Sequence, residues 1–184
     1  MKKGGVGGGN TKTGAVYETK TDLKTFLNTL NGYHVDDDYQ VFYKKALIGS
    51  IFKKNAFYVF LQNKGVDWKD IVSKRLMPDD SIYVLLNNVF YVIECKFQGV
   101  GGSVDEKLQT CDFKKKQYKK LLSKLNIEVE YIYILSDWFK KPCYKDSLDY
   151  IQSVGCDYYF DYIPLMRLGL PVPEGQSDDF YPLR

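Results

Sequence analysis

The chain has 184 residues, of which 45% are hydrophobic, 16% aromatic and 27% charged, and its formal net charge is +3. This length and composition predict one globular domain spanning residues 1–184 and exclude a disordered or fibrous chain. His34 is the single histidine, which excludes sites that need two histidines, such as many zinc centres. The four cysteines form no CxxC pair, so we expect reduced, structural thiols. An enzyme of this composition must work with carboxylates, lysines or hydroxyls.

The sequence contains no uninterrupted apolar run of about 18 residues, the length that a membrane helix requires. Its first residues lead into glycines rather than into the apolar core of a signal peptide. We therefore expect a soluble, cytoplasmic protein without a membrane partner.

The first 14 residues include six glycines, too many for a regular element. We expect an arm or loop over residues 1–14, in which Asn10, Thr11 and Thr13 are the polar side chains. A helical stripe of apolar residues follows over residues 15–30, with Glu18 near its start.

The remaining elements follow in chain order. Strand-forming residues fill 41–52, and short helices are predicted over 55–62 and 67–76. Two apolar runs, 81–86 and 89–97, surround Asn87-Asn88 and predict a β-hairpin. Ser103 and Glu106 form a capping box for one long helix over 103–125, which has an apolar face and a lysine face. A strand over 130–136, a helix over 145–154, a strand over 157–163 and an irregular tail over 164–184 complete the chain. This order predicts an α/β (α+β) fold in which helices flank a mixed sheet.

The hairpin determines which polar side chains share a face. If Asn87-Asn88 is a two-residue turn, residues whose numbers sum to 175 lie opposite each other, which places Asp79 opposite Lys96. Alternation along the strands then puts Asp79, Glu94 and Lys96 on one face, and Asp80 and Cys95 on the other.

Two carboxylates beside a lysine are typical of a site for Mg²⁺, or for Mn²⁺ as a substitute. The Lys96 ammonium could hold a phosphate oxygen, orient the attacking water or help it to lose a proton. The cluster therefore predicts metal-assisted phosphodiester hydrolysis. The alternative is an ion-pair ladder on the surface of an edge hairpin.

Pro78-Asp79, followed after fourteen residues by Glu94-Cys95-Lys96, resembles the PD…(D/E)xK motif of the restriction-endonuclease-like nuclease superfamily. Gln98 extends the match to Glu-x-Lys-x-Gln, and the resemblance covers roughly residues 14–136. Small Type II restriction endonucleases look most similar. The resemblance implies a restriction-endonuclease-like sheet with a catalytic hairpin, the Cys95 carbonyl as a further metal ligand, and Glu18 as an additional acid at the site. For Glu18 the alternative is a carboxylate that merely favours the start of a helix.

The expected function is that of a Mg²⁺-dependent, site-specific endonuclease that cuts double-stranded DNA as a homodimer and needs no nucleotide cofactor. Two alternatives remain open, namely a repair, junction or transposition nuclease of the same fold, and a nonenzymatic nucleic-acid-binding module. Lysines on one face of the helix after Ser103 would contact phosphates, unless that face is only solvated. The residues assigned to DNA contact are Gln98, Asn10, Thr11, Thr13, Lys114, Lys115 and Lys119.

Overall fold

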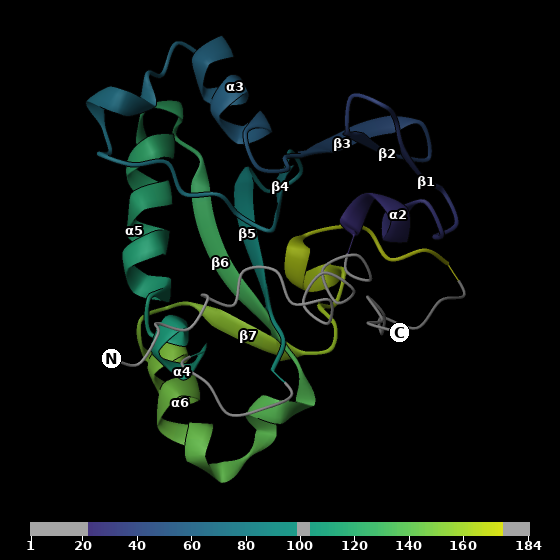
Figure 1. Cartoon of the computed structure of the whole chain (residues 1–184). Helices are drawn as coiled ribbons and strands as arrows, with labels where there is room; N and C mark the ends of the chain where they lie inside the picture. Colours follow the sequence, from purple (N-terminus) through teal and green to yellow (C-terminus); the bar gives the residue numbers. More distant parts are fainter. Residues whose placement is uncertain (1–21, 99–103, 175–184) are drawn as a thin grey trace, which may run out of the picture.

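The computed structural model describes residues 22–98 and 104–174, and its centre is a seven-stranded mixed sheet with helices on both faces (Figure 1). The strands lie side by side in chain order, antiparallel from β1 to β5 and parallel from β5 to β7. Their bounds are Tyr33–Val35 (β1), Gln40–Tyr43 (β2), Ala46–Ile51 (β3), Asp80–Val84 (β4), Val89–Lys96 (β5), Glu128–Leu135 (β6) and Asp157–Phe160 (β7). The predicted mixed sheet flanked by helices is confirmed.

The described α-helices are Leu23–Leu27 (α2), Ala56–Asn63 (α3), Val104–Leu108 (α4), Cys111–Leu122 (α5) and Lys145–Ser153 (α6). Short 3₁₀ turns cover Trp68–Asp70, Ser123–Leu125, Asp137–Lys140, Pro142–Tyr144 and Met166–Leu168. The helices predicted over 55–62 and 145–154 are confirmed, and a left-handed glycine, Gly65 or Gly155, follows each of them. The glycine-rich arm and most of the helix predicted over 15–30 lie outside the described residues.

Two helix predictions were wrong in extent. The predicted helix over 103–125 is two helices, because the Thr110 hydroxyl and backbone N–H both donate to the Lys107 carbonyl and end α4 there. The segment 67–76 forms only the turn Trp68–Asp70. Its end is held instead by Tyr58, whose hydroxyl accepts from the Leu76 N–H and donates to the Leu76 carbonyl.

The run predicted as strand over 41–52 is a hairpin of β2 and β3. Tyr43 pairs with Ala46, so the connection consists of Lys44 and Lys45, and both have positive φ. This is the geometry of a two-residue type I′ turn. The sequence does not predict it, because lysine is unusual at the two central positions of such a turn.

The sheet separates two cores. Phe90 and Val92 of β5 face α3, α5 and α6, whereas Tyr91 and Ile93 face α2 and the segment after β7. That segment was predicted to be an irregular tail. In the structure it is irregular but packed, because Leu165, Leu168 and Leu170 are buried against the sheet.

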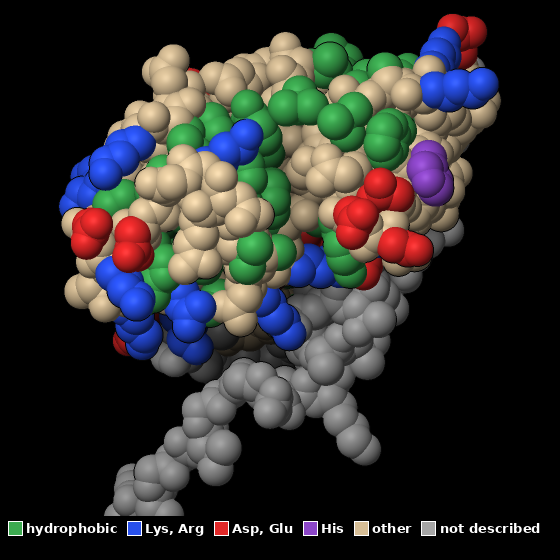
Figure 2. Space-filling view, turned by 90° about the horizontal axis from the view of Figure 1, so that it is seen from above, with side chains coloured by type: hydrophobic (Ala, Val, Ile, Leu, Met, Phe, Trp, Pro, Cys, Tyr) green, Lys and Arg blue, Asp and Glu red, His purple; other side chains and the backbone are tan. Residues whose placement is uncertain are grey.

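Charge is unevenly distributed over the surface. Figure 2 looks down on the molecule and shows most lysine and arginine side chains on the side of α3 and α5, with some acidic side chains among them. Acidic side chains lie beside the single histidine on the opposite side, below a second group of lysine or arginine side chains. No helix of the described segments is both long and apolar enough to cross a membrane.

Candidate active site

The hairpin β4–β5 carries the three residues of the predicted motif, with a register that differs from the prediction. Val84 pairs with Val89, so the turn is the four residues 85–88 and paired numbers sum to 173. Of the two asparagines in it, only Asn88 has positive φ, whereas a two-residue type I′ turn needs two such residues. The Leu85 N–H donates instead to the Ile48 carbonyl, so the residue after β4 is hydrogen-bonded to β3 and not to β5.

This shift of two residues corrects the predicted pairs, since Asp79 now precedes the Asp80–Ile93 pair and lies level with Glu94 rather than with Lys96. It leaves the faces unchanged, because side chains alternate with a period of two. Asp79, Glu94 and Lys96 do share one face, and Asp80 points to the other, where it accepts from the backbone N–H groups of Leu23 and Ser81.

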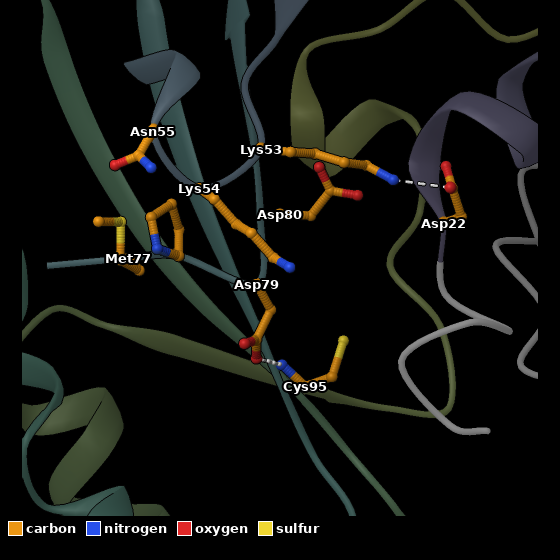
Figure 3. A pocket seen from close by; sticks show the side chains of 9 residues that line it. Asp22, Lys53, Lys54, Asn55, Met77, Asp79, Asp80 and Cys95 are labelled. Carbon is orange, nitrogen blue, oxygen red and sulfur yellow. Dashed lines mark hydrogen bonds and ion pairs between the residues drawn. The ribbon is translucent and has the colours of Figure 1, made fainter. Parts of the chain in front are cut away.

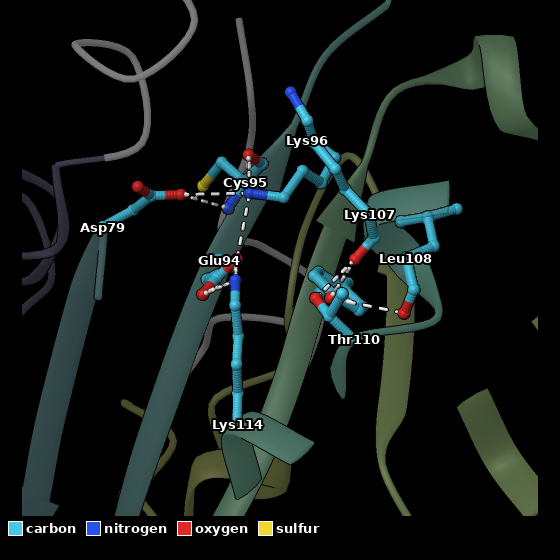
Figure 4. Close-up of polar contacts among 9 residues, drawn as sticks. Asp79, Glu94, Cys95, Lys96, Lys107, Leu108, Thr110 and Lys114 are labelled. Atoms are coloured by element: carbon cyan, nitrogen blue, oxygen red, sulfur yellow. Dashed lines mark hydrogen bonds and ion pairs between the residues drawn. The ribbon is translucent and has the colours of Figure 1, made fainter. Parts of the chain in front are cut away.

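Lys96 lies at the centre of three oxygen atoms. Its Nζ is 3.0 Å from Glu94 Oε2, 3.8 Å from Asp79 Oδ2 and 3.4 Å from the Cys95 carbonyl oxygen. Asp79 is fixed from the side, because its Oδ2 accepts a 3.0 Å hydrogen bond from the Cys95 backbone N–H (Figure 4). Asp79 lies just before β4, and Glu94 and Cys95 lie near the end of β5. Their two carboxylates and one backbone carbonyl thus converge on the Lys96 ammonium.

Glu94 is buried at 5% exposure and also receives the ammonium of Lys114 from α5, at 2.7 Å from Oε1 and 2.8 Å from Oε2. Burial alone would raise the pKa of Glu94, but Lys96 and Lys114 outweigh it and lower the pKa below its usual value. Burial would likewise lower the pKa of Lys96, yet Glu94 and Asp79 raise it. Both groups are therefore charged at neutral pH.

Tyrosines form the wall behind this charge cluster. Tyr131 and Tyr133 of β6 and Tyr118 of α5 are all buried. Burial, together with the charge of Glu94, raises the pKa of each of these phenols, so all of them are neutral. An aromatic wall excludes water and strengthens electrostatic interactions at the site.

The oxygen atoms around Lys96 Nζ are of the chemical type that hard divalent cations prefer, and the lysine ammonium lies among them. Asp79, Glu94 and the Cys95 carbonyl supply the oxygen ligands that Mg²⁺ prefers, and Mg²⁺ usually keeps several waters beside one or two carboxylates. Within residues 22–98 and 104–174, no group of three or more His, Cys, Asp or Glu side chains is placed to hold a metal ion. The donor set here is thus two side chains and one backbone carbonyl.

A pocket of about 420 Å³ adjoins the cluster on the far side of Asp79 (Figure 3). Its lining includes Asp79, Lys53, Lys54 and Cys95, and Lys53 is held at 2.6 Å by Asp22. Asp79 is therefore shared between the charge cluster and a cavity whose other charged lining residues are Lys53, Lys54, Asp22 and Asp80.

The structure places the other predicted site residues in different surroundings. Lys114 and Lys119 were assigned to phosphate contact from the lysine face of the helix. In the structure Lys114 lies against Glu94, and Lys119 is exposed. Lys115 had the same assignment, and its expected place on the outward lysine face was wrong, because it is buried and donates to the Gly155 carbonyl and to Glu130. Gln98 is buried, and its backbone N–H donates to the Ser136 hydroxyl. Glu18, Asn10, Thr11 and Thr13 lie outside the described residues.

The pairing of Lys114 with Glu94 was missed, although the sequence contains a signal for it. The apolar stripe predicted on this helix has a gap between Cys111 and Tyr118, which both face the sheet. Positions 114 and 115 fill that gap at helical spacing, so Lys114 and Lys115 had to lie at the sheet rather than in solvent.

The chain matches no known protein-family model, and comparisons with curated proteins and with solved structures find no significant similarity. The geometry of the site is therefore the basis for assigning a function.

Proposed function

We propose that the protein is a Mg²⁺-dependent endonuclease that hydrolyses phosphodiester bonds in double-stranded DNA, most similar to site-specific Type II restriction enzymes with a restriction-endonuclease-like core. The observation that carries this proposal is the convergence of Asp79 Oδ2, Glu94 Oε2 and the Cys95 carbonyl on Lys96 Nζ. A surface ion-pair ladder explains it less well, because Glu94 is buried and is held by two ammonium groups.

Asp79, Glu94 and the Cys95 carbonyl would hold Mg²⁺. When bound, the cation would stabilise the negative charge that develops on the phosphate oxygens during hydrolysis. Lys96 keeps its proton at neutral pH, since its pKa is raised, so its role is that of a hydrogen-bond donor to a phosphate oxygen or to the attacking water. The neighbouring pocket would give room for a nucleotide beside the scissile phosphate. Lys54 would contribute positive charge there, whereas Lys53 is paired with Asp22.

Cleavage of both strands needs two active sites, so we include a homodimer in the proposal. Analytical ultracentrifugation with and without DNA measures the molecular mass of the assembly in solution and so tests for the dimer.

Plasmid cleavage tests the function. We expect wild-type protein with Mg²⁺ or Mn²⁺ to cut plasmid DNA into discrete fragments, and excess chelator to abolish cutting. Asp79→Asn, Glu94→Gln and Lys96→Met should each lower the cleavage rate by about 100-fold or more, the usual effect of removing one group that stabilises a transition state.

The matched control is Glu128→Gln, because Glu128 is exposed and pairs with Val89 at the other end of β5. It should cut at the wild-type rate. Retardation of DNA in a gel without cleavage at any Mg²⁺ concentration would instead identify a nonenzymatic nucleic-acid-binding module, and smeared products would indicate a nuclease without site specificity.

A further inference from the structure

Glu94 binds two ammonium groups at once, and this is more than it needs for neutrality. Lys114 contacts both carboxylate oxygens, whereas Lys96 contacts one of them and also lies near Asp79. With Asp79, the cluster contains two negative and two positive charges. A divalent cation that enters it meets carboxylates that already have counter-ions.

The two lysines at this end of α5 differ in their freedom to move. The Lys114 side chain is 26% exposed and its stem rises from α5 to Glu94 (Figure 4). The Lys115 side chain is 10% exposed and is tied to Glu130 and to the Gly155 carbonyl. A lysine stem has four rotatable carbon–carbon bonds, so the Lys114 ammonium can reach another anion without a shift of the helix.

We propose that Lys114 is an exchangeable counter-ion, which leaves Glu94 for a backbone phosphate when DNA binds, so that DNA and the divalent cation bind cooperatively. This inference rests on the proposed function, since the DNA phosphate is the second partner of the lysine.

The physical basis is competition for one carboxylate. Lys114 and the cation both stabilise the charge of Glu94, so each weakens the binding of the other. A phosphate that attracts Lys114 removes the competitor and tightens cation binding. Linkage requires the cation to tighten DNA binding by the same factor.

The test is a calorimetric titration of the full chain with Ca²⁺, alone and with a duplex of about 20 base pairs, which presents phosphates on both strands along the site. Ca²⁺ replaces Mg²⁺ because its looser coordination is expected to support binding with poor hydrolysis. The proteins are wild type, Lys114→Met, Lys114→Arg and Lys145→Met, the last because Lys145 is an exposed lysine of α6 that pairs with Asp149 and not with the cluster.

Without DNA, Lys114→Met should bind Ca²⁺ at least about fivefold more tightly than wild type, the lower end of typical coupling between two sites. DNA should tighten Ca²⁺ binding by a similar factor in wild type and by much less in Lys114→Met. Lys114→Arg keeps the charge and Lys145→Met leaves the cluster intact, so both should resemble wild type.

Unchanged or weaker Ca²⁺ binding by folded Lys114→Met overturns the inference. If that variant does not fold, the wild-type titration still tests the inference. An absence of any effect of DNA on the Ca²⁺ affinity of wild type also overturns the inference. Wild type that cuts plasmid without this coupling rejects the inference alone. Coupling without cleavage rejects the hydrolytic function and leaves the exchange of Lys114 in place.

Discussion

Asp79 and Asp80 are neighbours in the sequence but differ in surroundings. Asp79 is exposed just before β4, whereas Asp80 is buried at the start of the strand and its two oxygens accept from Leu23 N–H and Ser81 N–H. Burial raises the pKa of Asp80 to about 7, although these N–H groups and Lys53 act in the opposite direction. The carboxyl that belongs to the motif is thus the one that solvent can reach.

Stability should therefore depend on pH through Asp80. The native state keeps the Asp80 proton up to about pH 7 while the unfolded chain releases it near its usual value, so this group destabilises the fold progressively as pH rises through that window. Asp80→Asn resembles the protonated carboxyl. In urea unfolding, the stability of Asp80→Asn relative to wild type should rise by about 3 kcal/mol between pH 5 and pH 8. A difference that does not change with pH would show that Asp80 is ionised throughout.

At the scale of elements, the turns of the two hairpins have lengths other than those that their sequences suggest. Asn87-Asn88 resembles a two-residue turn but belongs to a four-residue one, while Lys44-Lys45 forms the two-residue turn. Lys45 has φ +69, a left-handed conformation that costs a residue with a Cβ atom about 1 kcal/mol or more.

Lys45→Gly should relieve this strain and raise the free energy of unfolding by about 0.5–1 kcal/mol. Lys64→Gly is the matched control, because Lys64 is an exposed residue at the end of α3 with φ −93. It should lower stability, since glycine gains only unfolded-state entropy there. Thermal unfolding of both variants measures the contrast, and equal effects would argue against the type I′ turn.

On the scale of the whole molecule, the sheet separates an aromatic core under α3, α5 and α6 from an aliphatic one under α2. The candidate site lies where β5 ends, at the end of the sheet from which α5 starts. Lys119 and Lys120 are exposed farther along α5, the helix that brings Lys114 to the site, so DNA that follows this helix would pass both lysines.

If DNA follows this path, Lys119→Gln should weaken DNA binding for all sequences and reduce the slope of log K against log salt by about 0.9, one phosphate contact. Fluorescence anisotropy at several salt concentrations measures this slope. Lys120→Gln gives an independent second reading on the same face. The parent slope in both variants would place the DNA elsewhere.

The sequence by itself determined the elements whose signals are local. Helices α3 and α6 stop at glycines that adopt left-handed backbone, and the apolar runs around residues 85–88 form a hairpin. It also determined that Asp79, Glu94 and Lys96 share a face, because alternation along a strand survives a register shift of two.

Only the tertiary structure decided the partners of these side chains. The register of β4 and β5 depends on a hydrogen bond from Leu85 to β3, and the state of Glu94 depends on Lys114, twenty residues later on α5. Lys115 looked like a surface lysine until Gly155 and Glu130 supplied its partners. Such contacts join residues distant in the chain, and periodicity and propensity describe only neighbours along it.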